Sequence, residues 1–297
     1  MRYLALTLAL VAAPFAEAQT QQKVDIRRAA APDVSVRLSG AFVSLRIIAW
    51  PVDSIAITGA VGPGSRFEGG SLNREGPVQG MKFYVDGPMD PTVSSNRFEL
   101  RVPRGARVWV KTGTADIDCT GVGGGLDLNV IGGSIRVNGK PRELLVESMD
   151  GAVHFTGFAE FARVKTATGN IVVAAGGEDL TFTTVSGSIQ AANDQQLVQR
   201  ARFESVTGPI TFTGDLPRGA DLRFDSHSGA IDLRLGGKSP VEVDVSTMTG
   251  TIENSFSQHR PAPGREGRGM ELSTSSGMGA ARVEVKSFKG NVRLTQK

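Results

Sequence analysis

One stretch of eight residues decides the fold: Val164-Lys165-Thr166-Ala167-Thr168-Gly169-Asn170-Ile171. It has the form apolar-x-Ser/Thr-x-x-Gly-x-Ile/Val, and the same form returns at residues 182–189 and 285–292. The turn position of the repeat falls at Ala115, Gly133, Gly151, Gly169, Gly187, Gly208, Gly229, Gly250 and Gly290. Its spacing is 18 residues for four intervals, 21 for three, and 40 for the last. Self-similarity at a nearly constant period is typical of stacked repeats.

Apolar residues occupy the same positions in every unit. Two residues after the turn, all nine units carry Ile or Val, from Ile117 to Val292. Five residues before the turn stand Val110, Leu128, Val146, Val164, Phe182, Phe203, Phe224, Val245 and Val285. The next residue along the chain is polar in every unit, as in Lys111 and Glu204. This alternation has the period of a β-strand with one buried face.

A hydroxyl column lies three residues before the turn. Eight of the nine units carry Ser or Thr there, and Val130 is the exception: the eight are Thr112, Ser148, Thr166, Thr184, Ser205, Ser226, Thr247 and Ser287. We expect these hydroxyls to be buried at a corner and to find hydrogen-bond partners, because buried polar groups are rarely left unpaired. The Gly at the turn predicts a positive φ, which costs Gly nothing.

These columns predict an all-β protein, a parallel β-solenoid of the β-helix type, built from stacked 18- to 21-residue coils. A single unit cannot bury its apolar face alone, so neighbouring coils must cover one another. The regular repeats occupy residues 108–297, with an insertion at 255–282. Residues 19–107 follow the pattern less closely and are predicted to form irregular N-terminal β coils. Within them, residues 77–96, which contain three prolines, are predicted to form an excursion or a loop.

The N-terminus has the pattern of a secretory signal peptide. A short apolar run, Leu4 to Ala13, precedes the small-residue pattern Ala16-Glu17-Ala18, so residues 1–18 are the predicted leader. The run is shorter than the roughly 20 residues that span a bilayer, and we predict no transmembrane segment after cleavage. We therefore expect an exported bacterial protein, either periplasmic or extracellular.

Charge and cysteine content narrow the functional classes. The net charge of the chain is +3, and no run of Lys and Arg alternates with aromatic residues as in nucleic-acid grooves. We therefore predict no nucleic-acid partner. One cysteine, Cys119, cannot form an internal disulfide. It stands where other units place Val137 or Phe155, so we expect it to be a small core residue.

The repeat resembles the DUF4097 family of adhesin-like β-strand repeat proteins. The residues that carry the resemblance are Arg101-Val102-Pro103-Arg104-Gly105, residues 164–171, Thr183-Thr184-Val185-Ser186-Gly187-Ser188-Ile189 and Lys286-Ser287-Phe288-Lys289-Gly290-Asn291-Val292. The resemblance covers essentially the whole mature chain. It implies an architecture and an adhesin-like role, and it provides no catalytic residues.

The candidate site residues come from stacking the outward columns. Three residues after the turn, successive units place Asp118, Arg136 and His154 in one column. β-Helix enzymes that act on polysaccharides use such outward clusters, whereas a solvated ladder of opposite charges, worth little, is the interpretation that we favour. Six residues before the turn lies a second column, which contains Arg163, Arg202 and Arg223. It could hold an anionic glycan or a lipid head group, but we favour a solvated face whose charge is neutralised, because Glu204 and Asp225 lie two residues from two of the arginines.

Metal and cofactor chemistry are not indicated. His227 and His259 lack the neighbouring ligands that a metal site requires, and we predict no metal and no cofactor. The leading hypothesis is a non-catalytic protein of the cell envelope or exterior that presents an adhesin-like surface to a glycan or protein partner. Two alternatives stay open: a polysaccharide lyase or hydrolase on the same scaffold, and a self-assembling envelope scaffold.

Overall fold

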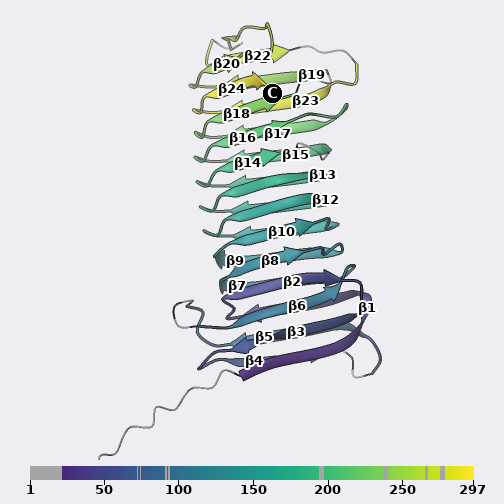
Figure 1. The fold of residues 1–297 in the computed structure, drawn as a ribbon. Helices are drawn as coiled ribbons and strands as arrows, with labels where there is room; N and C mark the ends of the chain where they lie inside the picture. The colour runs from purple at the N-terminus through teal and green to yellow at the C-terminus, as the bar shows by residue number, and fades with distance from the viewer. Residues whose placement is uncertain are drawn as a thin grey trace, which may run out of the picture.

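The computed structural model describes residues 22–71, 73, 75–90, 92, 94–193, 197–236, 240–264, 267–274 and 278–297. The predicted leader, residues 1–18, lies outside them. Every regular element that these residues form is a strand, so the all-β prediction is confirmed. Figure 1 shows the strands stacked in one direction, with β1 and β4 at one end and β20 and β22 at the other.

Two sets of strands alternate along the chain and form two faces. The first face ends at the hydroxyl column and contains β7 (Arg107–Thr114), β9 (Gly125–Gly132), β11 (Glu143–Ser148), β15 (Val198–Ser205), β17 (Asp221–Ser226), β19 (Val241–Thr247) and β23 (Ala281–Ser287). The second face follows the turn and contains β8 (Asp116–Thr120), β10 (Ile135–Gly139), β14 (Ile189–Ala192), β16 (Ile210–Gly214), β18 (Ile231–Leu235), β20 (Ile252–Asn254) and β24 (Val292–Gln296). Two longer strands, β12 (Val153–Thr166) and β13 (Ile171–Thr184), contribute to both faces.

Parallel pairing joins equivalent residues of successive units. Leu144 of β11 lies beside Ala162 of β12, 18 residues later, and Leu180 of β13 lies beside Ala201 of β15, 21 residues later. The 18- and 21-residue periods of the sequence are therefore the separations between residues that pair on neighbouring strands. Because the register is constant, each sequence column becomes a row of side chains along the stack.

The core lies between the two faces. The inward rings of Phe182, Phe203 and Phe224 stack on one another, with centroids 5.5 and 4.9 Å apart. Phe212 of the second face packs against Phe203 and Phe224 at 5.9 and 5.7 Å. All four rings are almost completely buried, so the period-two columns form the core as predicted.

The hydroxyl column is buried and hydrogen-bonded, as predicted. Ser205 Oγ donates to the carbonyl oxygen of Gly208 at 2.7 Å, and Ser226 Oγ donates to that of Gly229 at 2.9 Å. At the turn of Gly187, the direction is reversed, and the Gly187 N–H donates to Thr184 Oγ1 at 3.1 Å. The Ser/Thr-x-x-Gly spacing therefore places the hydroxyl within hydrogen-bond distance of the turn glycine, across the corner.

The predicted reason for the turn glycine is wrong in nearly every unit. Among the turn glycines, Gly133 has a positive φ (96°), whereas Gly208 and its equivalents do not. A Cβ on Gly208 would collide with the carbonyl oxygen of Gly187 in the neighbouring coil. Glycine is needed here because two backbones approach closely, and this close approach repeats from coil to coil.

The N-terminal region contains β1 (Gln22–Gly40), β2 (Ser44–Trp50), β3 (Ser54–Val61), β4 (Arg66–Ser71), β5 (Val78–Asp86) and β6 (Arg97–Pro103). The parallel stack continues through β1, β2, β5 and β6, whereas β3 and β4 run antiparallel to their neighbours. The loop predicted at residues 77–96 is wrong for Val78–Asp86. Met81, Phe83 and Val85 of that strand are buried, and this local alternation outweighs the flanking prolines.

The last unit does not stack in chain order. Strand β23 pairs with β17 on one side and β19 on the other, so the C-terminal unit lies between two units that precede it. The described part of the insertion adds β21 (Ala262–Pro263) and β22 (Met270–Thr274). Strand β22 pairs antiparallel with β19 and covers its outer side.

Candidate binding surface

The predicted column of Asp118, Arg136 and His154 forms a row of neighbouring residues. Arg136 pairs in register with Asp118 on one side and with His154 on the other. Arg136 Nη1 donates to Ser134 Oγ at 3.1 Å, and this hydroxyl donates to Asp116 Oδ1 at 2.7 Å. The hydrogen bonds from Ser134 lower the pKa of Asp116. The row lies on an open strand face, outside the cavities described below.

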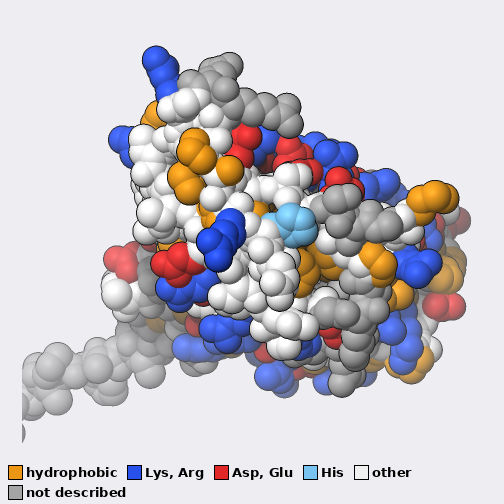
Figure 2. Space-filling model, turned by 90° about the horizontal axis from the view of Figure 1, so that it is seen from above, with side chains coloured by type: hydrophobic (Ala, Val, Ile, Leu, Met, Phe, Trp, Pro, Cys, Tyr) orange, Lys and Arg blue, Asp and Glu red, His pale blue; other side chains and the backbone are white. Residues whose placement is uncertain are grey.

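The arginine column also forms a row. Arg202 pairs in register with Arg223 on one side and, through Thr181, stands two strands from Arg163. Each arginine has a local partner: Arg202 contacts Glu204 at 3.0 Å, Arg223 contacts Asp221 at 3.3 Å, and the Arg163 guanidinium lies 5.5 Å from the Phe161 ring centre. Acidic and basic side chains are likewise interspersed over the end of the molecule in Figure 2. Such exposed pairs contribute little stability, and they cancel most of the row's positive charge.

A row of exposed apolar side chains follows the corner where the first face ends. Its members lie two residues before each turn, and backbone hydrogen bonds such as Met149 N to Ile131 O (3.1 Å) stack them. This corner row consists, in stack order, of Ile131, Met149, Ala167, Val185, Val206, His227, Phe288 and Met248. Its six large apolar members are between 43% and 61% exposed. They add nothing to the core, and exposed apolar surface of this kind marks binding sites.

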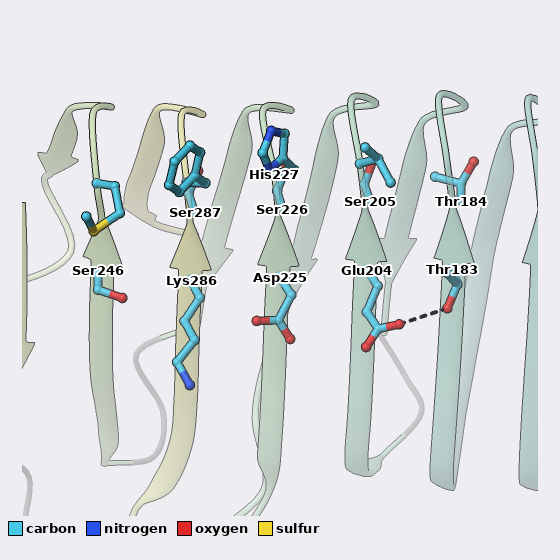
Figure 3. A pocket seen from close by; sticks show the side chains of 13 residues that line it. Thr183, Thr184, Glu204, Ser205, Asp225, Ser226, His227, Ser246, Lys286 and Ser287 are labelled. Atoms are coloured by element: carbon cyan, nitrogen blue, oxygen red, sulfur yellow. Dashed lines mark hydrogen bonds between the residues drawn. The ribbon is translucent and has the colours of Figure 1, made fainter. Parts of the chain in front are cut away.

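A shallow cavity of about 510 Å³, the corner groove, lies against the upper part of the corner row (Figure 3). Its apolar lining is supplied by Val206, His227, Phe288 and Met248. Its polar lining consists of hydroxyl-column residues and of the first-face row before them, whose members here are Thr183, Glu204, Asp225, Lys286 and Ser246. Figure 3 shows each of these polar residues on a separate, neighbouring strand.

Two rings form the centre of the groove's apolar lining. The rings of His227 and Phe288 lie nearly parallel, at 12°, with centroids 5.1 Å apart. The ammonium group of Lys289 lies 6.0 Å from the Phe288 ring centre. Both ring-bearing residues are exposed, so together they form an exposed aromatic pair that spans two coils.

Asp225 is the unusual polar group of the groove. Burial raises the pKa of Asp225, while the charges of Arg202 and Lys286 lower it and those of Glu204 and Glu284 raise it. No hydrogen bond from the described residues reaches its carboxylate. A half-buried carboxylate without a donor can accept hydrogen bonds from a ligand.

The two other charged groove residues, Glu204 and Lys286, are engaged with neighbours. Glu204 Oε2 accepts from Thr183 Oγ1 at 3.3 Å, and its second oxygen accepts from Arg202 at 3.0 Å. Lys286 contacts Glu284 at 2.5 Å, and this contact lowers the pKa of the glutamate. Of the two carboxylates that line the groove, Glu204 is therefore engaged on both oxygens, whereas Asp225 accepts no hydrogen bond from the described residues.

A second hollow lies lower on the first face, around Trp109. Two adjoining cavities, of about 450 and 230 Å³, share Trp109, Asp127 and Leu145. Burial raises the pKa of Asp127, and the charges of Glu147 and Glu143 raise it further. This hollow lies on the same face as the corner groove, and none of these three cavities is lined by Asp118, Arg136 or His154.

Other candidate chemistry is limited. Cys119 is buried beside Ile47 and Val137, as predicted, and burial raises the pKa of its thiol. Across the described residues, no group of three His, Cys, Asp or Glu side chains could hold a metal ion. In that same part of the chain, no helix is long and apolar enough to cross a membrane.

The interpretation of the sequence missed the corner row, although a signal for it was present. Seven of its eight members are apolar at one fixed position, two residues before the turn. The period-two pattern tells buried from exposed side chains only within a strand. At a turn, where the chain changes direction, an apolar column can be either buried or exposed.

Comparison with known proteins adds little. No family model matches the sequence, and no curated protein matches it. Two solved structures match: a "putative cell adhesion protein" from Clostridium sporogenes (10% identity, TM-score 0.23) and a "putative adhesin" from Bacteroides fragilis (8% identity, TM-score 0.45). Each alignment covers 94% of this chain and 99% of the other. Likenesses at these scores carry no argument about this chain, and the resemblance to DUF4097 stays a prediction.

Proposed function

We propose that this chain is an exported parallel β-solenoid of the DUF4097 type, which binds a partner at the cell envelope or outside the cell without catalysing a reaction. The corner row is the observation that carries the proposal. Its large apolar side chains recur in coil after coil while each is about half exposed. Selection for the core alone does not favour such side chains at a solvated corner, whereas a binding surface requires them.

The charged rows support a non-catalytic role. Asp118, Arg136 and His154 are neighbours in register but lie on an open face, whereas catalytic groups are commonly found in clefts that shift their pKa values. A polysaccharide lyase or hydrolase is the alternative that this argument disfavours. Its test is the release of new reducing or unsaturated sugar ends from anionic polysaccharides.

The ends of the first face argue against a scaffold that grows end to end. Antiparallel strands lie at both ends of this face: β4 pairs with β5 at one, and β22 covers β19 at the other. An added coil would have to pair in parallel, as the interior strands do. Covering a strand at the end of the stack, as β22 covers β19, is a recognised protection against edge-to-edge association.

Binding of the mature protein, residues 19–297, to immobilised cell-envelope fractions tests the proposal. The probes are bacterial outer-membrane vesicles and purified peptidoglycan. We expect at least one fraction to bind the parent, and we expect Val206→Asp together with Met149→Asp to reduce binding about tenfold, because charge at the corner row opposes apolar contact. Gln190→Asp, on the exposed second face, is the matched control and should bind like the parent.

Two results would overturn the proposed function. One is the absence of binding to every fraction. The other is binding that the corner-row variant retains in full. Turnover of a polysaccharide that is abolished by alanine at any one of Asp118, Arg136 and His154, with the melting curve intact, would establish the enzyme in its place.

A further inference from the structure

We infer that the corner groove binds the sugar rings of a neutral, extended glycan chain, which lies along the stack over His227 and Phe288. The inference rests on the proposed function, because it names the ligand class of the same surface. Its structural basis is the combination of an exposed aromatic pair, an open carboxylate and a narrow apolar row in one cavity.

The width of the apolar surface favours a chain-like ligand. The corner row is one side chain wide, and polar rows flank it on both sides. A folded protein partner usually covers about 800 Å² of each surface around an apolar centre. A row of single side chains, spaced by about 4.8 Å from coil to coil, suits a ligand that is itself narrow and repeats along its length.

The chemistry of the lining matches a sugar ring. A pyranose has apolar C–H faces and a rim of hydroxyl groups, so it needs an apolar platform with hydrogen-bonding groups at its edges. The stacked rings of His227 and Phe288 provide the platform. Asp225 provides an acceptor on the first-face side. Hydroxyls such as that of Ser228 lie on the turn side of the corner row.

Asp225 supplies the specific contact. Its carboxylate is half buried at the groove and accepts no hydrogen bond from the described residues. A carboxylate that is partly desolvated gains more from a hydroxyl donor than a fully solvated one does. Two neighbouring sugar hydroxyls can donate to its two oxygens, and this would fix the position of the chain along the row.

The charge of the flanking rows favours a neutral ligand. Between the coil of Ile131 and the coil of Met248, these two rows contain four carboxylates and three ammonium groups. They are Glu147, Glu204, Asp225, Asp150, Lys165, Lys286 and Lys289. Because the carboxylates outnumber the ammonium groups, the two rows carry no excess positive charge that would attract a polyanion. The arginine row, which the sequence suggested for anionic glycans, is largely neutralised by its own partners.

Calorimetric titration of the mature protein tests the inference. The probes are chitohexaose and cellohexaose as neutral chains, and a hexameric oligogalacturonate as the anionic one. We expect a neutral chain to bind at least about tenfold more tightly than the anionic one. Phe288→Ala and Asp225→Asn should each weaken that binding about tenfold, the first through the lost platform and the second through the lost acceptor.

Gln190→Ala on the second face is the control, and melting curves show whether each variant is folded. Unchanged affinity in both groove variants, tighter binding of the anionic chain, or no binding of either neutral chain would each overturn the inference. If envelope fractions still bind through the corner row while the neutral chains do not, the glycan inference fails and the proposed function stands. If neither binds, both fail.

Discussion

The row of turn glycines yields the sharpest test of the fold. Gly208→Ala adds one methyl group that would collide with the carbonyl oxygen of Gly187, a backbone atom that cannot rotate away. To relieve the contact, two coils must separate at the corner. This separation stretches the hydrogen bonds from Thr207 N to Val185 O (2.8 Å) and from Ile189 N to Pro209 O (2.9 Å).

The expected cost follows from these contacts. Each stretched hydrogen bond forfeits about 1 kcal/mol, and overpacking by one methyl group adds about 1–3 kcal/mol. We therefore expect Gly208→Ala to lower the free energy of unfolding by about 3–5 kcal/mol. Equilibrium unfolding in urea, followed by circular dichroism, measures the change.

Gly70 provides the matched control. It lies in β4, has no positive φ, and a Cβ at this position would meet nothing within 4 Å. Gly70→Ala should be neutral or stabilising by up to about 1 kcal/mol, because alanine restricts the unfolded chain. The reasoning is refuted if Gly208→Ala unfolds within 0.5 kcal/mol of the parent, on the order of an ordinary surface change, or if both alanine variants lose stability equally.

Three further predictions use the same protein. Ile189→Asp should lower the urea midpoint far more than Gln190→Asp, because Ile189 is fully buried and its neighbour is exposed; equal midpoints would show that the register is wrong. Cys119 should react with a thiol reagent after denaturation and not before, since burial opposes its thiolate; rapid labelling of the native protein would contradict this. The raised pKa of Asp225 means that stability falls as pH rises from the ordinary aspartate range through the folded value. Asp225→Asn should therefore melt higher than the parent at pH 7 and like it at pH 3, and a gap that does not change with pH would contradict the assignment.

The core was predictable because its determinants are local. Phe182, Phe203 and Phe224 alternate with polar neighbours within single strands, and a strand with one buried face needs no more than that alternation. The 18- and 21-residue spacings then predicted which residues pair on neighbouring strands. The sequence therefore predicted which side chains point inward within the strands of the regular region, though not at the corners.

Contacts between coils were not predictable in the same way. The glycine column could be seen in the sequence, but its cause is the carbonyl of the neighbouring coil, as at Gly208 and Gly187. The corner row was equally visible as a column, yet the exposure of Val206 and Phe288 depends on how the chain bends there. The binding surface also depends on Asp225, which lies beside these residues and accepts no hydrogen bond from the described residues. The sequence columns do not show whether a side chain has a hydrogen-bond partner.

The order of the last units shows why periodicity has this limit. Val285 of β23 lies in register with Phe224 on one side and Val245 on the other, so the columns fit either neighbour equally well. The pairings of the last strands distinguish the two orders where the columns do not. Strand β22, from the insertion at 255–282, pairs antiparallel with β19 on the side away from β23. The final unit lies on the other side of β19, where β23 and β24 each have parallel partners on both sides.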